Sequence, residues 1–234
     1  MFLMKYRKII PAVFLSRPNR FIARVLIDGK EETVHVKNTG RCKELLREGV
    51  TVYLSEGDNP QRKTKYDLVA VEKIRDGKEK LLVNMDSQLP NAVAAEWIKK
   101  SGIFSENALI KREVTFGKSR FDIYVEDKER RAFVEVKGVT LEGDGVASFP
   151  DAPTERGTKH LNELIECKRN GFEAYILFVI QMKEIHLFTP NFEHDPVFSD
   201  TLRKAEKEGV KILAVDCIVT PVEVICDKEV KIKL

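Results

Sequence analysis

Asp122, Glu135 and Lys137 lie within 16 consecutive residues, and their side chains have the chemistry to bind a metal ion and use it. Residues i and i+2 of a β-strand point to the same face, so Glu135 and Lys137 project together from the apolar run at 132–138. Two carboxylates on adjacent strands supply the oxygen ligands that Mg²⁺ prefers. A lysine beside them can position a metal-bound water, whose pKa the metal lowers, for attack on a phosphodiester.

The same short pattern also fits a surface edge strand with alternating charges. Glu-x-Lys occurs in strands by chance, and its spacing from Asp122 adds little specificity. An ionised pair of carboxylates in an otherwise apolar strand is costly, however, unless a ligand or a partner compensates the charges. The surrounding elements favour the metal site.

Residues 84–234 predict an α/β (α+β) domain, a sandwich with a mixed sheet. The motif occupies a hairpin of strands at 121–125 and 132–138. The continuous apolar run at 174–180 is typical of a central strand that is buried on both faces. Three helices are expected: one at 92–100, which Asn91 can cap and which contains Glu96, one through 161–168 that Asp151 or Thr154 can cap and that ends at Gly171, and one at 202–208. Further strands are expected at 110–115 and 210–215.

Residues 1–83 predict a small closed β-barrel of the oligonucleotide-binding (OB) type. Strands are expected at 12–15, 21–27, 32–36, 50–54 and 66–74, with a short helix near 43–46. The Asp28-Gly29 pair is typical of a hairpin turn between the second and third strands. Five short strands and one short helix match an OB barrel.

Barrels of this type bind single strands through basic grooves and exposed aromatic rings. The candidate basic contacts are Arg17, Arg20, Arg24, Lys37, Arg62, Lys63 and Lys65. Phe21 or Tyr66 could stack on bases, although a core position is the plainer interpretation of each ring. In the second domain Arg156, Lys159 and His160 could meet phosphate near a helix start, and a surface salt-bridge face is the alternative.

The composition supports a folded, two-domain, polyanion-binding protein. The 234 residues are 43% hydrophobic and 33% charged, which is enough apolar material for a core. Residues 1–83 hold 18 Lys and Arg against 11 Asp and Glu, whereas residues 84–234 hold 22 against 26. A basic first third indicates an electrostatic footprint for a polyanion. An ordinary charged surface is the alternative.

The rest of the composition excludes several classes of protein. No apolar run approaches the roughly 18 residues of a membrane helix, and no signal peptide is recognisable, so a cytoplasmic protein with no membrane contact is expected. The four cysteines form no Cys-x-x-Cys pair and have no histidine at zinc-finger spacing. Free thiols in a reducing compartment are therefore expected instead of a zinc site.

Several longer stretches carry a resemblance to a known family. They are Val-His-Val-Lys-Asn-Thr-Gly at 34–40, Leu-Pro-Asn at 89–91, Ser-Arg-Phe-Asp at 119–122, Phe-Val-Glu-Val-Lys-Gly-Val-Thr-Leu at 133–141, Phe-Pro-Asp-Ala at 149–152 and Thr-Glu-Arg-Gly-Thr-Lys-His-Leu at 154–161. Over nearly its full length the chain resembles the sugar fermentation stimulation protein A family. The resemblance implies an N-terminal OB barrel at 1–83 and a PD-(D/E)xK nuclease-like domain at 84–234.

The resemblance also implies roles for individual residues. The Asp, Glu and Lys of the nuclease pattern map onto Asp122, Glu135 and Lys137, and Glu96 matches a helical acid that precedes the core strands in many of these folds. Phe121 stands where the pattern's name has proline, which leaves the ligands intact. The family further implies DNA binding without strong sequence preference and a regulatory role in sugar metabolism.

Two functions are compatible with these residues. The first is an Mg²⁺- or Mn²⁺-dependent DNA nuclease in which Asp122 and Glu135 bind the metal, Glu96 assists and Lys137 orients water. The second is a non-catalytic DNA-binding regulator of sugar (maltose) metabolism genes. Binding of single- or double-stranded DNA is common to both. Exposed helix faces near 200–208 are compatible with a homodimer. A sugar-cleaving enzyme has little support, because a lysine between paired acids would be unusual there.

Overall fold

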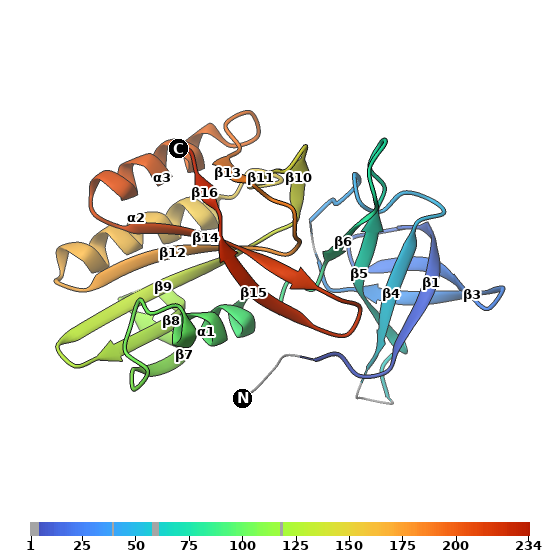
Figure 1. Cartoon of the computed structure of the whole chain (residues 1–234), viewed down its shortest axis with the longest axis horizontal. Coiled ribbons are helices and arrows are strands. Elements are labelled where there is room, and N and C mark those ends of the chain that lie inside the picture. Colours follow the sequence, from blue (N-terminus) through green and yellow to red (C-terminus); the bar gives the residue numbers. More distant parts are fainter. Residues whose placement is uncertain (1–4, 39, 58–60, 118) are drawn as a thin grey trace. The chain divides into compact units, whose positions relative to one another are not determined.

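A computed structural model of the chain describes residues 5–38, 40–57, 61–117 and 119–234 (Figure 1). The chain divides into two compact units. The first comprises the chain up to Leu89 together with residues 181–183 and 217–225, and the second comprises the remainder. The sequence placed the boundary after residue 83 and expected two uninterrupted domains, so these two returns of the chain to the first unit were not foreseen.

The first unit is built on a closed five-stranded barrel. Its strands are β1 (Ile9–Ser16), β2 (Ile22–Ile27), β3 (Lys30–Val36), β4 (Thr51–Glu56) and β5 (Tyr66–Lys73). They lie in the order β3-β2-β1-β4-β5, and a parallel pairing of β3 with β5 closes the barrel. Alternate residues fill its interior, as Ala23 and Val25 of β2 show, both fully buried. This is the expected OB-type topology.

Two local features of this unit differ from the expectation. The segment at 43–46 forms turns instead of a short helix, because the chain has a positive φ of 46° at Cys42 and turns again at Gly49 (φ 84°). A sixth strand, β6 (Leu81–Asn84), extends the sheet by pairing antiparallel with β5. Its four residues are too few to show a clear alternation in the sequence.

The second unit is built on a mixed six-stranded sheet. The order is β15-β14-β12-β9-β8-β7, with bounds β7 (Leu109–Phe116), β8 (Ser119–Asp127), β9 (Arg130–Val139), β12 (Glu173–Ile180), β14 (Lys211–Val219) and β15 (Val224–Glu229). β7, β8 and β9 pair antiparallel, whereas β12 pairs parallel with both β9 and β14. β12 is buried from Ala174 to Ile180, as its continuous apolar run predicts.

Three helices pack in the second unit (Figure 1): α1 (Pro90–Lys100), α2 (Glu155–Arg169) and α3 (Pro196–Lys207). α1 and α2 contact β9 and β12, and α3 contacts α2. Thr154 caps α2 by accepting a hydrogen bond from the Gly157 N–H. Asp195 caps α3 with proline next, so α3 begins six residues before the expected start at 202. Nowhere in the described residues is a helix long and apolar enough to span a membrane.

A second, smaller sheet completes this unit. It has the order β10-β11-β13-β16, with bounds β10 (Leu141–Gly143), β11 (Val146–Phe149), β13 (Leu187–Pro190) and β16 (Lys231–Ile232). These strands have two to four residues each, which is too short for a periodic sequence signal, and none was expected.

Candidate functional site

The β8–β9 hairpin brings the predicted carboxylates together. Ile123 pairs with Val134, so one further step of the same register sets Asp122 opposite Glu135. The Val136 N–H donates a hydrogen bond of 2.8 Å to Asp122 Oδ2, which ties the aspartate to the strand that carries the glutamate. The separation of Asp122 and Glu135 in the sequence is therefore explained by a tight hairpin, which sets the two residues opposite each other on paired strands.

Glu135 is buried, and its two oxygens are in different situations. Oε1 accepts a hydrogen bond of 2.6 Å from Lys137 Nζ and lies within hydrogen-bond distance of His160 Nδ1. Oε2 is buried and has no hydrogen-bond partner among the residues that the structure describes. An unpartnered carboxylate oxygen in an interior is costly, and a cation is the kind of ligand that would compensate it.

The charges around the two acids separate their pKa values. Burial raises the pKa of Asp122, and the nearby charge of Glu135 raises it further. Burial alone would also raise the pKa of Glu135, but the hydrogen bonds and charges of His160 and Lys137 outweigh it and lower that pKa. Glu135 is thus held ionised as an acceptor, which requires that His160 Nδ1 carries the proton.

Asn91 also belongs to this site, in a role that differs from the one expected from the sequence. It was expected to cap the helix, but α1 begins at Pro90, which places Asn91 inside the first turn. Its Nδ2 donates a hydrogen bond of 2.7 Å to Asp122 Oδ1. Both Asp122 oxygens therefore have a donor, and the only signal in the sequence was the Leu-Pro-Asn motif itself.

Glu96 is not joined to the carboxylate pair by any hydrogen bond or ion pair among the described residues. It lies half-buried on α1. Within that same part of the chain, three or more acidic, histidine or cysteine side chains do not gather closely enough to hold a metal ion. A metal at this place would take protein ligands from Asp122 and Glu135 and keep several waters, as Mg²⁺ commonly does.

The strand beside Asp122 is locally distorted. β7 pairs with β8 through Arg112–Ile123 and Val114–Phe121, and the pair between them, Glu113 and Asp122, is interrupted. Glu113 has a φ of 57°, in the left-handed region. Such conformations are uncommon for side chains other than glycine, asparagine and aspartate, and they cluster at functional sites.

The predicted contacts on the barrel fall into two groups. Arg20, Lys63 and Lys65 are exposed. Arg17 instead holds a loop, because its two terminal nitrogens donate hydrogen bonds to the carbonyls of residues 20, 38, 40 and 41. Arg62 and Lys37 are engaged by Asp67. The sequence showed which residues are basic, but it did not show which of them have partners.

The two candidate stacking rings differ in the same way. Tyr66 is 8% exposed and belongs to the core, with Lys65 Nζ 5.0 Å from its ring centroid. Phe21 is 56% exposed, so the plainer expectation of a core position is wrong for this ring. Arg20, which precedes it in the sequence, is also exposed, and single-strand-binding surfaces use exposed cations together with exposed aromatic rings.

On α2, the three candidate phosphate contacts also separate. Arg156 and Lys159 are exposed, and Lys159 lies 3.7 Å from Glu163. His160 is 6% exposed and faces Glu135, so a phosphate contact by this side chain is wrong for the structure described here. Although His160 lies one turn after the exposed Arg156, its side chain lies on the buried side of α2. Gln181, which follows the apolar run at 174–180, is buried and donates to Asn84 Oδ1 and the Asp86 carbonyl.

The fold and the carboxylate pair define a class of protein. An OB-type barrel is followed in the chain by a mixed-sheet α/β domain, and a hairpin of that domain carries Asp122, Glu135 and Lys137. This is the combination of an OB fold with a domain of the PD-(D/E)xK nuclease type.

The comparisons with known proteins identify the family. Residues 15–79 match the SfsA N-terminal OB domain, and residues 88–223 match the sugar fermentation stimulation protein RE domain. The chain belongs to the sugar fermentation stimulation protein family. It is 59% identical to a sugar fermentation stimulation protein homolog of Desulfitobacterium hafniense, over 99% of both chains. A homolog from Clostridium beijerinckii is 55% identical over 92% of this chain and 93% of its own.

A solved structure is similar over the whole chain. It is that of Pyrococcus furiosus SfsA in complex with Ca²⁺, and it covers 100% of both chains with a TM-score of 0.86 and 31% sequence identity.

Proposed function

We propose that the chain is a DNA-binding protein with little sequence preference whose second unit hydrolyses phosphodiesters with a divalent metal ion. The observation that carries the proposal is the buried, unpartnered Oε2 of Glu135 beside Asp122. Oxygen donors from two carboxylates suit a hard cation such as Mg²⁺ or Mn²⁺. The structure of the Pyrococcus furiosus relative with Ca²⁺, another hard cation, supports a cation-binding role for the family fold.

Each residue of the site would have a separate role in this reaction. Asp122 and Glu135 would hold the metal, which when bound supplies a nucleophilic water and stabilises charge on the phosphate. Lys137, with Nζ 2.6 Å from Glu135 Oε1, would orient the attacking water and neutralise developing negative charge. His160 and Asn91 would fix the two carboxylates, as the outer partners of metal ligands do.

The barrel would supply sequence-independent affinity. Exposed Arg20, Lys63 and Lys65 suit contacts with phosphates, and exposed Phe21 suits stacking on bases. None of these contacts reads base edges, so the affinity should vary little with sequence.

The decisive experiment incubates the purified protein with single- and double-stranded DNA in Mg²⁺, Mn²⁺ or EDTA. Glu135→Gln and Lys137→Met are compared with Lys80→Met, which removes an exposed lysine of the other unit. The proposal expects metal-dependent cleavage that both site variants lose and that the control keeps. Cleavage that survives Glu135→Gln, or DNA binding without cleavage in any metal, would contradict the hydrolytic part.

A second candidate function is a DNA-binding regulator that does not cleave. The observation in its favour is that Asn91 and the Val136 N–H already occupy both oxygens of Asp122, which leaves fewer free lone pairs for a metal. In that case the Asp122–Glu135 pair would serve only the packing of the hairpin. The cleavage experiment separates the two functions, because DNA binding without cleavage is what the regulator predicts.

A further inference from the structure

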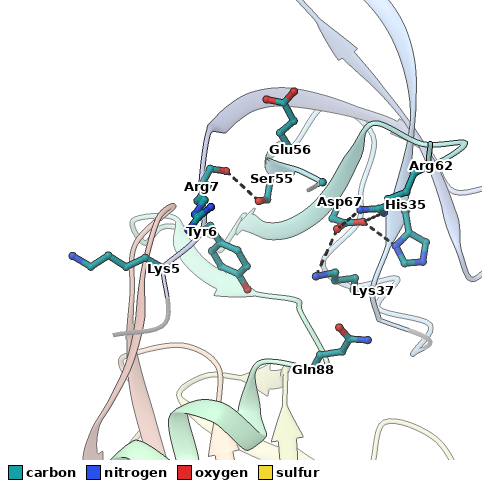
Figure 2. Close-up of a pocket in the computed structure, with 11 residues that line it drawn as sticks. Lys5, Tyr6, Arg7, His35, Lys37, Ser55, Glu56, Arg62, Asp67 and Gln88 are labelled. Carbon is teal, nitrogen blue, oxygen red and sulfur yellow. Dashed lines mark hydrogen bonds and ion pairs between the residues drawn. The ribbon is translucent and has the colours of Figure 1, made fainter. Parts of the chain in front are cut away.

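A pocket of about 560 Å³ lies in the first unit, near the point where β3 pairs with β5 to close the barrel (Figure 2). Its walls come from the segment before β1, from the ends of β3 and β4, from the loop between β4 and β5, and from Gln88. Its volume falls within the range of about 300–1,000 Å³ typical of small-molecule sites. The carboxylate pair of the second unit takes no part in it.

The floor of the pocket is a buried ionic cluster around Asp67, which is 5% exposed. Arg62 donates two hydrogen bonds to its carboxylate, His35 Nδ1 lies 3.0 Å from Oδ1, and Lys37 Nζ lies 3.6 Å from Oδ2. Burial would raise the pKa of Asp67, but Arg62, His35 and Lys37 outweigh it and lower that pKa. One ionised carboxylate thus gathers three basic side chains at the same place, as Figure 2 shows.

Gly57 shapes the pocket by leaving room for Arg62. A Cβ added at Gly57 would overlap the guanidinium of Arg62, and its φ lies outside the left-handed region that favours glycine. The absence of a side chain at this position is therefore explained by the space Arg62 needs, and not by backbone conformation. An alanine here should displace Arg62 without straining the chain.

Tyr6 forms the opposite wall. Its hydroxyl donates to Asp86 Oδ2 at 3.3 Å and accepts from Asn84 Nδ2 at 3.0 Å, which fixes the ring. Burial raises the pKa of Tyr6, and the charge of Asp86 raises it further, so the phenol stays neutral. A fixed neutral aromatic ring is a surface on which a planar base can stack.

The lining carries an excess of positive charge. Lys5, Arg7, Lys37 and Arg62 face two lining carboxylates, Glu56 and Asp67, and a third carboxylate, Asp86, lies 3.3 Å from Lys37 Nζ. Arg7 is exposed and makes no ion pair or side-chain hydrogen bond within the described part of the chain, and Lys5 has only Glu223 at 3.9 Å. A cation without an internal partner at the rim of a pocket is available to an anionic ligand.

The cluster is not arranged for nucleophilic catalysis. Ser55 and His35 are both register partners of Asp67, so the aspartate stands between them, whereas a Ser-His-Asp triad needs the histidine in the middle. The Ser55 hydroxyl donates to the Arg7 carbonyl instead. This arrangement suits binding.

We propose that the pocket binds a nucleoside monophosphate, with the phosphate held by Arg7 and Lys37 and the base against Tyr6. One water occupies about 30 Å³ in the liquid, so a pocket of about 560 Å³ has room for many molecules of that size. A phosphate ion alone would therefore leave most of the pocket volume empty. The ligand chemistry has two sources, a free nucleotide and the phosphorylated terminal nucleotide of a strand. The inference does not rest on hydrolysis by the carboxylate pair.

Calorimetric titration of the full chain with 5′-AMP, adenosine and inorganic phosphate tests the proposal. AMP should bind at least about tenfold more tightly than either adenosine or phosphate, because each of these lacks one half of the recognition. Arg7→Gln should weaken AMP binding by about tenfold. Lys63→Gln, exposed and outside the pocket lining, and Glu135→Gln, in the other unit, should bind AMP as the unaltered protein does.

Three results would overturn the proposal. AMP could fail to bind, adenosine or phosphate could bind as tightly as AMP, or Arg7→Gln could bind AMP with unchanged affinity. Arg7 is exposed, so this variant should fold normally, and thermal melts of each variant check it. Matched oligodeoxynucleotides with a 5′-phosphate or a 5′-hydroxyl then identify the source. A preference for the phosphorylated strand that Arg7→Gln removes assigns the pocket to strand ends, and equal affinities assign it to free nucleotides.

Discussion

At the scale of single residues, the surroundings shift the pKa of Glu135 and the pKa of Asp122 in opposite directions. Lys137 and His160 stabilise the ionised form of Glu135, whereas burial and Glu135 itself destabilise the ionised form of Asp122. A group whose pKa is raised by folding destabilises the folded state fully at pH values above its folded pKa, and this penalty declines as the pH falls from the folded pKa to the lower unfolded pKa. The metal-free protein therefore has a repulsion at neutral pH that a bound cation would relieve.

Replacement of Asp122 by asparagine should make this repulsion visible. Asp122→Asn should raise the melting temperature of the metal-free protein at neutral pH, because its amide oxygen accepts from the Val136 N–H without carrying charge and its NH2 can donate to Asn91 once the Asn91 amide is flipped. It should also abolish any rise in melting temperature on addition of Mn²⁺. Thermal melts in EDTA and in Mn²⁺ measure both effects. A variant that keeps the full response to Mn²⁺ would show that Asp122 is not a ligand.

The sequence predicted that Asp122, Glu135 and Lys137 lie together, but it did not predict the contacts of Asn91 and His160. The hairpin placed Asp122 opposite Glu135 because strand register follows from a short connection, and the alternation put Lys137 on the same face. The contacts of Asn91 and His160 depend on how α1 and α2 pack on the sheet. No local pattern encodes that packing, so the two residues were assigned to a cap and to a phosphate contact.

At the scale of elements, the start of α2 depends on a glycine. The Gly157 N–H donates to the capping Thr154 Oγ1, and a Cβ at Gly157 would lie 2.8 Å from Thr154 Cγ2 and 3.1 Å from Phe198 Cε2 of α3. Gly157→Ala should therefore destabilise the fold by about 1–3 kcal/mol, although alanine in a helix interior usually stabilises by about 1 kcal/mol relative to glycine.

Urea unfolding of Gly157→Ala measures the sign of this effect. Asn162→Ala is the matched control, because Asn162 is exposed on the same helix and should be neutral or stabilising as alanine. A stabilised Gly157→Ala would mean that α2 and α3 can separate at this point without cost.

The strand β12 is anchored at its first residue by a polar network. Arg130 donates two hydrogen bonds to Glu173, and Tyr175 and Lys211 contact the same carboxylate. The hydrogen bonds and charge of Arg130, with those of Tyr175 and Lys211, lower the pKa of Glu173 to about 2. This stabilisation is present above the unfolded pKa of about 4.3 and is lost as the pH falls toward the folded pKa.

Glu173→Gln should therefore lower the free energy of unfolding at neutral pH by about 1.5–3 kcal/mol. The difference from the unaltered protein should shrink as the pH is lowered from about 5 to about 2. Urea melts across this range measure it, with Glu166→Gln, an exposed partner of Arg169, as control. A difference that does not change with pH would mean that packing, and not the charge of Glu173, anchors the strand.

Elements with a strong periodic signal were predicted well. The barrel strands, the hairpin and β12 carry apolar alternation or continuous apolar runs over five or more residues. The sequence did not predict the short strands β10, β11, β13 and β16, because they are defined by tertiary pairing. It also missed the first half of α3, which is defined by the Asp195 cap. The turns at 43–46 replaced an expected helix for a similar reason, because Cys42 adopts a positive φ.

At the scale of the whole molecule, the barrel should bind single strands by stacking and by charge, and salt separates the two contributions. Phe21→Ala should weaken binding of a single-stranded oligonucleotide without changing the slope of log affinity against log salt, because a ring neutralises no phosphate. The double variant Lys63→Ala with Lys65→Ala should reduce that slope by about 0.7 for each phosphate contact that is lost.

Fluorescence anisotropy over a range of KCl concentrations measures these affinities, and Lys80→Ala, an exposed lysine paired with Glu72, is the control. An unchanged affinity in Phe21→Ala would mean that this exposed ring does not contact the strand. A slope that is unchanged in the lysine pair would assign the phosphate contacts to other basic residues, for which exposed Arg20, Arg156 and Lys159 are the remaining predicted candidates.

The most direct test of the central claim is a crystal structure of the protein soaked in Mn²⁺, with the anomalous signal of the metal recorded. If the two carboxylates bind the metal, an anomalous peak should lie within bonding distance of Glu135 Oε2 and of a carboxylate oxygen of Asp122, and Glu135→Gln should lack this peak. A map without a peak at this pair, or a peak that remains in Glu135→Gln, would contradict the metal site and the hydrolysis that depends on it.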